Sequence, residues 1–518
     1  MDFRINRETV AAAETIFDGI QEQSVELDYI LPDYYPDIFR LVRCEITPSV
    51  TDYSVSGDRL NYELVCGIRI LYCSEGGSVL QCVSQRQCFS KYIDLGSGAG
   101  GDISVRLVPK PEHINCRAVN KRRLDLRGAV SVKIKAEGER VQEVISDAQG
   151  MNIQLKKTAL RYAAKKLTAE KSMQISEETE LSATQPAVIN VVSCRCRTSK
   201  CEKKMISGKL LAKGDADIEI LYSCEEDGSG ALETLSYTVP YSQVIDVDEL
   251  DDSYECTVSA EPVCCEAVPA ADKDGDNRII RTELELKIIC RAVKTASLML
   301  VTDAYSTVYP CELKTAEIKA EQLPVVMTES FRSSAVIAEG EAVPQTVYGM
   351  WCAPKNINTR LADDGCSLVI SGMLTYTLAA KDSGGMIIMS DKDEAFEETV
   401  ELSGEPCGSC VSAEVEVTGV NYNIGADNIL TAKAELKAEI SSCSSSSVRG
   451  VTDIFVNDVE KKQRDGDYAI KLYYGSENEA VWDIAKRYST CVDSVIEENE
   501  LSGEILESGK MLLIPIIN

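Results

Sequence analysis

Residues 279–289 read Ile-Ile-Arg-Thr-Glu-Leu-Glu-Leu-Lys-Ile-Ile, a run in which apolar and polar side chains largely alternate. Successive side chains of a β-strand point to opposite faces, so this alternation predicts a strand with one buried face and one face in water. Similar runs stand at residues 124–134 and 429–440. The three runs are spaced by about 150 residues, which indicates an internal repeat.

Two further landmarks recur in the same order within each repeat. One is an apolar strand opened by a proline and followed by a cysteine; the prolines are Pro36, Pro186 and Pro344. The other is an alternating strand that leads into a glycine-containing turn, at residues 66–72, 216–222 and 372–378. Half-buried strands separated by Gly, Asp and Ser turns indicate a two-layer β-fold. The sequence therefore predicts a mainly β protein with three tandem β-sandwich-like repeats.

The length of 518 residues exceeds what a single core supports. We expect the repeats to occupy residues 1–150, 151–308 and 309–458, and a small C-terminal module to occupy residues 459–518. A charged, glycine-containing run of linker composition leads into this module. Residues 155–167 fit either a connecting helix or an edge strand, and the pattern does not separate the two.

The C-terminal module changes its period part-way along. Residues 468–473 alternate like a short strand, and the spacing from Val481 to Tyr488 then predicts one face of a helix. Thr490 followed by Asp493 predicts a capping box that opens a second helix. Residues 511–516 predict a second strand, so the expected order is strand, helix, helix, strand.

At these residues the chain resembles the LysM module. The matching positions are Tyr468, Ile470, Trp482, Ile484, Ala485, Tyr488, Ile496, Asn499, Leu512, Ile514 and Pro515. The resemblance implies a compact βααβ fold. Where that family has Gly-Asp-Thr-Leu, this chain has an acidic loop at residues 475–480, and this change argues against binding in the N-acetylglucosamine groove.

A second resemblance covers the repeats. The run from Leu31-Pro32 to Pro36-Asp37-Ile38, the strand through residues 70–72 and the long final strand resemble the SPOCS domain of sporulation proteins in endospore-forming bacteria. Three such units followed by one LysM module resemble the SipL-like spore-coat morphogenetic proteins. The resemblance implies a coat morphogenetic ATPase of the SpoIVA type as partner, with other coat proteins as further contacts. It also implies a place in the mother-cell cytosol, at the forespore surface.

Composition excludes several classes of function. The 83 acidic residues outnumber the 54 basic ones, and the net charge of −29 argues against a nucleic acid or an anionic membrane as the main partner. The N-terminal residues lack a basic segment followed by an apolar core, and no apolar run approaches the roughly 20 residues of a membrane span. We therefore expect a cytoplasmic protein without a signal peptide or transmembrane segment.

Catalytic and metal chemistry find little support. The single histidine, His113, stands three residues from Cys116 on a predicted strand, so the two side chains point to opposite faces. The 21 cysteines include a lone CxxC at residues 407–410 and a lone CxC at residues 194–196, whereas a zinc site needs four ligands. In a reducing compartment we interpret these cysteines as small buried apolar residues. We expect no enzyme, no cofactor and no metal.

Recognition is the function that the residues favour. Trp482 is one of two tryptophans, and large aromatic side chains commonly dominate protein interfaces. Lys471 and Lys486 are basic points in an acidic protein that suit an acidic partner, and a solvated helix end is the plainer interpretation of Lys486. Trp482 as a core residue of the module is the equally weighted alternative. The predicted partner-binding residues are Trp482, Lys486, Tyr473, Tyr474, Lys471 and Ile484.

Two hypotheses of different classes follow. The first is a non-enzymatic assembly protein whose C-terminal module docks onto the coat ATPase while the β-repeats act as a scaffold. The alternative is a protein that binds peptidoglycan or N-acetylglucosamine through its LysM groove. A hydrolase has no residues to support it.

Overall fold

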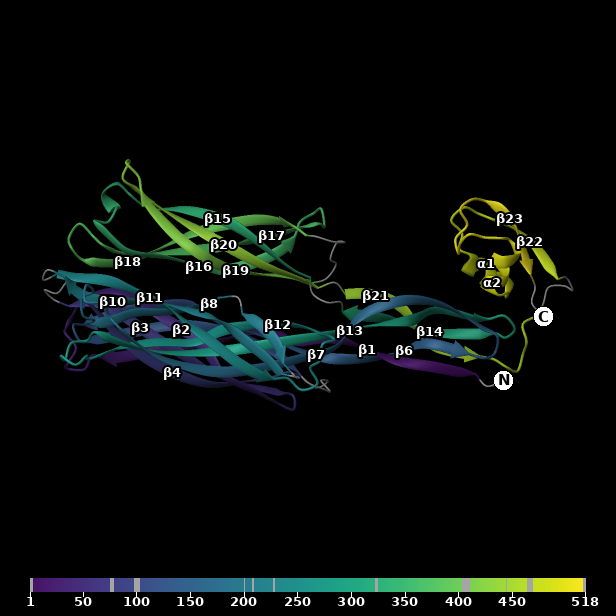
Figure 1. Ribbon diagram of the computed structural model, residues 1–518, viewed down its shortest axis with the longest axis horizontal. Coiled ribbons are helices and arrows are strands. Elements are labelled where there is room, and N and C mark those ends of the chain that lie inside the picture. Colours follow the sequence, from purple (N-terminus) through teal and green to yellow (C-terminus); the bar gives the residue numbers. More distant parts are fainter. Residues whose placement is uncertain are drawn as a thin grey trace.

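A computed structural model describes the protein over residues 3–74, 79–96, 103–199, 201–206, 209–226, 229–321, 325–402, 410–443, 445–463 and 469–515. The protein is mainly β, with 77% of residues in strands and 4% in helices, which confirms the expected fold class. Figure 1 shows an elongated molecule with long sheets at one end and a small helical module at the other. No helix in these ranges is long and apolar enough to cross a membrane.

The first unit is a sandwich of two three-stranded antiparallel sheets. One sheet has the order β1-β6-β5 and the other has the order β2-β3-β4. Gly57, with φ of +63°, begins the two-residue turn between β2 and β3, where a positive φ favours glycine. The apolar faces of the central strands meet between the sheets, as the alternation predicts. The strands are β1 (Arg4–Ile30), β2 (Ile38–Ser56), β3 (Arg59–Ser74), β4 (Leu80–Asp94), β5 (Ser104–Asn120) and β6 (Arg123–Gln149).

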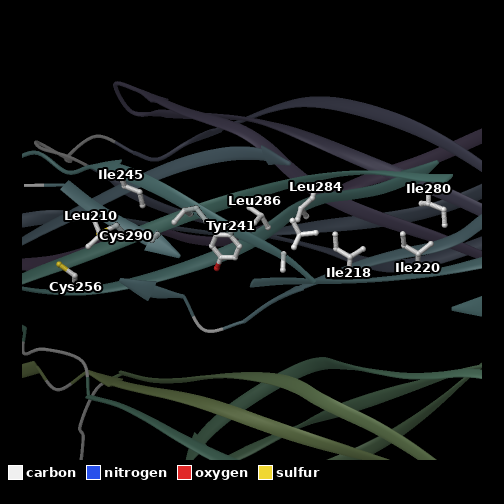
Figure 2. Packing of buried hydrophobic residues seen from close by; sticks show 14 of the residues in the cluster. Leu210, Ile218, Ile220, Tyr241, Ile245, Cys256, Ile280, Leu284, Leu286 and Cys290 are labelled. Carbon is white, nitrogen blue, oxygen red and sulfur yellow. The ribbon is translucent and has the colours of Figure 1, made fainter. Parts of the chain in front are cut away.

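The second unit repeats this topology. Its sheets have the orders β12-β13-β7 and β11-β10-β8, and the short β9 also pairs with β10. Figure 2 shows its core, which includes Ile218, Ile220, Ile280 and Leu284. Residues 155–167 lie within β7, so they form a strand and not a connecting helix. The strands are β7 (Ile153–Glu180), β8 (Asn190–Thr198), β9 (Glu202–Ile206), β10 (Lys209–Glu226), β11 (Ser229–Asp246), β12 (Tyr254–Ala270) and β13 (Ile279–Ser306).

The third unit has the same order, but its first and last strands are each divided in two. The sandwich consists of β15-β20-β19 and β16-β17-β18, and β14 pairs with β21 as a separate ribbon. The elements are β14 (Cys311–Glu321), β15 (Val325–Glu339), the 3-10 turn η1 (Gly340–Ala342), β16 (Thr346–Leu361), β17 (Ser367–Lys381), β18 (Ile387–Glu401), β19 (Cys410–Ile424), β20 (Ile429–Cys443) and β21 (Ser445–Val456).

Beyond the sandwiches, the paired first and last strands of the three units continue as three two-stranded ribbons, which together we call the stalk. The ribbons pair residues 4–15 with 137–149, residues 153–165 with 294–306, and β14 with β21. Each ribbon packs on both of the others. Their shared core includes Ile145, Val301 and Val451, one from each last strand. An isolated hairpin is at best marginally stable, so each ribbon depends on the other two.

The sandwiches also pack on one another at the opposite end. Leu71, Leu221 and Ala379, one from the central strand of each unit, are buried together there. Arg43 of the first unit pairs with Asp391 of the third at 2.6 Å. The three units are therefore arranged cyclically about one axis and not as beads on a string.

The C-terminal module has the predicted βααβ order. Its elements are β22 (Ile470–Gly475), α1 (Val481–Tyr488), α2 (Val492–Glu498) and β23 (Lys510–Pro515). Tyr468 and residue 516, which the sequence assigns to the strands, lie outside the described residues. The predicted capping box is wrong: α2 has Cys491 at its N-cap without a side-chain bond. The Thr490 hydroxyl instead donates to the Pro515 carbonyl, which ties the start of α2 to β23.

Candidate functional site

The C-terminal module lies against the tip of the stalk, and one carboxylate at the end of β13 organises the contact. Trp482 of α1 donates its indole N–H to Oδ2 of Asp303 at 2.8 Å. Lys486, one turn later on the same helix, donates to Oδ1 and Oδ2 of Asp303 at 2.6 and 2.7 Å. The i, i+4 spacing puts both side chains on one helix face, so a single acceptor satisfies both.

Tyr305 extends this contact from the same strand. Its ring meets the Trp482 indole edge to face, with centroids 5.0 Å apart. Its hydroxyl donates to the Thr490 carbonyl at 2.7 Å, and burial raises the pKa of this phenol. Trp482 is only 7% exposed as a result of its packing in the module and on the stalk.

Residues beside the aromatic pair complete the interface. Lys462 donates to the Ser306 carbonyl at 2.7 Å and to the Ser489 hydroxyl at 3.1 Å, and desolvation lowers the pKa of this amine. The Cys491 thiol donates to Oε1 of Gln154 on β7 at 3.3 Å. We call the module surface formed by Trp482, Lys486 and the start of α2 the docked face.

Three other predicted binding residues lie inside or along the module. Ile484 is fully buried in its core. The Tyr473 hydroxyl donates to Glu479 at 2.7 Å and accepts from Arg487 at 2.8 Å. The Lys471 amine lies 5.7 Å from the centre of the Tyr488 ring. These contacts place the three residues in the module's own packing, and a direct partner contact by any of them stays a prediction.

Tyr474 lies on a second surface, the outer side of the β22–β23 hairpin. It is 67% exposed and stands opposite Met511, and Leu472 stands opposite Leu513. Leu472 and Met511 are 66% and 62% exposed. We call these four residues the hairpin face. Sequence reasoning found Tyr474 but missed the face as a whole, although the period-two alternation that puts Leu472 on one face of the strand also puts Tyr474 on that face.

Sequence reasoning also missed Asp303 and Tyr305, because both lie far from the module along the chain. In the described part of the chain, no cluster of three or more His, Cys, Asp or Glu side chains could hold a metal ion. His113 is an exposed residue of β5. Cys407 of the CxxC lies outside the described residues.

The match to a known family falls on the sandwiches. The family described as SipL, SPOCS domain, matches residues 37–119 and 187–267. The chain therefore carries two SPOCS domains in tandem, as in a SipL-like protein. The matched ranges run from β2 to β5 and from β8 to β12, the corresponding strands of the first two units. The match to this domain indicates a sporulation-related protein. No curated protein and no solved structure matches the chain.

Proposed function

We propose that this SipL-like protein is a non-enzymatic spore-coat assembly protein whose C-terminal module binds a coat morphogenetic ATPase of the SpoIVA type. The observation that carries the proposal is the docked face. Within the chain, Trp482 and Lys486 already bind a protein surface made of a carboxylate and an aromatic ring. Tryptophan is one of the residues that dominate interface hot spots, and Lys486 adds a cation for an acidic acceptor on the same helix face.

The arrangement of the SPOCS units supports a scaffold role. The units pack on one another both in the stalk and between the sandwiches, and the module lies at the end of the stalk (Figure 1). Such a body holds the module well away from the sandwiches, whose outer surfaces serve further coat proteins. The proposed location is the mother-cell cytosol, at the forespore surface. Two points support it: the matched domain is a sporulation domain, and the proposed partner is an ATPase of the spore coat.

The experiment is a calorimetric titration of the purified ATPase with the full-length chain and with residues 1–458. The proposal predicts that the full-length chain binds and that the truncated chain, still β-rich by circular dichroism, loses at least tenfold in affinity. Equal affinity of the two would overturn the assignment of docking to the module. Saturable binding of chitin oligomers by the full-length chain, with none of the ATPase, would favour the glycan-binding alternative.

A further inference from the structure

The stalk repeats one aspartate three times. An apolar residue, a Ser or Thr and an Asp follow one another at residues 145–147, 301–303 and 451–453, near the end of each unit's last strand. In all three ribbons the pairing register skips the middle residue, so each Asp follows a β-bulge. Asp147, Asp303 and Asp453 therefore hold equivalent positions around the stalk.

Two of these carboxylates receive a cation from the neighbouring ribbon. Lys157 donates to Asp147 at 2.7 Å, and Arg7 pairs with Asp453 at 2.8 Å. Arg7 and Lys157 are equivalent residues, because they stand opposite Ile145 and Val301 in their ribbons. The equivalent residue of the third ribbon, opposite Val451, is Thr315.

Thr315 carries no charge, and its hydroxyl accepts a bond from Arg449 at 3.1 Å. The position that supplies a cation in the other two ribbons therefore supplies none to Asp303. Lys486 of the module takes that place, and its amine contacts both carboxylate oxygens. The residue two positions after Asp303 is Tyr305. The equivalent residues after Asp147 and Asp453 are Gln149 and Phe455. One end of the stalk thus offers, next to an aromatic ring, an aspartate whose ion pair comes from the module and not from the neighbouring ribbon.

We propose that the docked face binds its partner through a carboxylate beside an aromatic ring, and that Asp303 and Tyr305 hold this face closed until such a partner replaces them. This inference rests on the proposed function and names both the chemistry that the partner presents and the control of access to it. The end of the stalk and the partner's surface then present the same two groups to the docked face, a carboxylate and an aromatic ring.

The contact is suited to exchange. It relies on a few side chains, and Asp303 and Lys486 keep 25% and 41% of their side-chain surface exposed, so water and salt weaken their attraction. The linker holds the module near the stalk at a high effective concentration, and the partner competes against this. Only molecules in which the stalk has left the face can bind the partner. The apparent affinity therefore equals the affinity of the open face multiplied by the fraction of open molecules.

The test compares full-length variants in a titration with the purified ATPase. Thr315→Lys restores the missing cation of the third ribbon without touching the module, and Asp303→Asn removes the charge that holds Lys486. Both are expected to tighten binding at least threefold, whereas Trp482→Ala is expected to weaken it more than tenfold. Thr158→Lys, which adds the same charge at an exposed stalk position beside Lys157, is the matched control and leaves the affinity unchanged.

A second readout needs no partner. In a Trp351→Phe background Trp482 is the single tryptophan, and its quenching by acrylamide is expected to rise in Thr315→Lys and Asp303→Asn but not in Thr158→Lys. Unchanged quenching in both variants overturns the closed face. If the wild type binds the ATPase and neither Thr315→Lys nor Trp482→Ala changes the affinity, the partner uses another surface such as the hairpin face. That result overturns the inference about the docked face but leaves the proposed function standing. Absence of binding in every variant overturns the proposed function as well.

Discussion

At the scale of single residues, the apolar side chains of the module have two roles. Some build its core, and others also contact the stalk. Ile484 and Trp482 lie on the same short helix, yet Ile484 is fully buried whereas Trp482 also donates to Asp303 and meets the ring of Tyr305. The helical period puts Ile484 on one face with Val481 and Tyr488 and puts Trp482 on another with Lys486, because residues two apart in a helix do not face each other. It does not identify what Trp482 contacts. Their roles differ through the stalk, which no local pattern in the module encodes.

Replacement of Ile484 by alanine should unfold the module and not remove a partner contact. Loss of a fully buried Ile side chain costs about 2–5 kcal/mol, which is large for a domain this small. Limited proteolysis should release the C-terminal residues, while the β signal of residues 1–458 persists. A variant that keeps a protease-resistant module yet loses the ATPase would instead identify Ile484 as a direct contact.

The residue scale also shows where sequence reasoning went wrong. Thr490 and Asp493 have the spacing of a capping box, but the Thr490 hydroxyl is taken by the Pro515 carbonyl. A capping box is a local motif, and here a strand that pairs from the far end of the module competes for the same hydroxyl. The sequence predicts Trp482 and Lys486 among the partner-binding residues, but Asp303 lies too far away in the sequence to be predicted as their acceptor.

At the scale of elements, strand alternation predicts the sheets well, because it reports directly which face is buried. It does not predict that β7 and β13 run on past their sandwich into the stalk. Residues 155–167 illustrate this limit, since Leu155, Leu160 and Tyr162 pack in the stalk core and their spacing mimics a helix. The three-ribbon core arises from contacts between units, so it is absent from any local pattern.

The ion pairs that join the ribbons should contribute to stability in a pH-dependent way. A hydrogen bond from Lys157 holds the pKa of Asp147 below its ordinary value of 3.8. Because the folded pKa is depressed, the stabilisation is present above about pH 4 and is lost as the pH falls through the folded pKa. Both side chains are partly exposed, at 32% and 29%, so the effect is modest, roughly 0.2–1 kcal/mol.

Lys157→Met should therefore lower the thermal unfolding midpoint slightly at pH 7, and the difference from wild type should shrink as the pH is lowered below 4. Lys156→Met, an exposed neighbour on β7, is the control and should match wild type at both pH values. A deficit of Lys157→Met that stays constant down to low pH would show that the ion pair with Asp147 is not its cause.

On the scale of the whole molecule, three repeats close around one axis and leave one stalk position, Thr315, different from its counterparts. The repeats can be predicted from their period, but their cyclic packing depends on residues such as Ile145, Val301 and Val451, which are spread over the chain. That packing brings the end of β13 beside the C-terminal module. The candidate site is therefore a product of the whole fold.

A charge in the stalk core should separate the three ribbons. Val451 is fully buried among them, so Val451→Asp places an unpaired carboxylate there at a cost of several kcal/mol. Small-angle scattering should then show a larger radius of gyration, and the unfolding midpoint should fall. Phe455→Asp, on the same strand but 47% exposed, should leave both values near wild type. Similar scattering curves for the two variants would mean that the stalk does not hold the units together.

The most direct test of the central claim is hydroxyl-radical footprinting of the full-length chain with and without saturating ATPase. In the free chain Tyr305 is 3% exposed and Trp482 is 7% exposed, so both should be oxidised slowly. If the partner replaces the stalk on the docked face, oxidation of Tyr305 rises on binding while Trp482 stays protected. Unchanged oxidation of Tyr305 and Trp482, with new protection at Tyr474 and Met511, would contradict the account and assign the partner to the hairpin face.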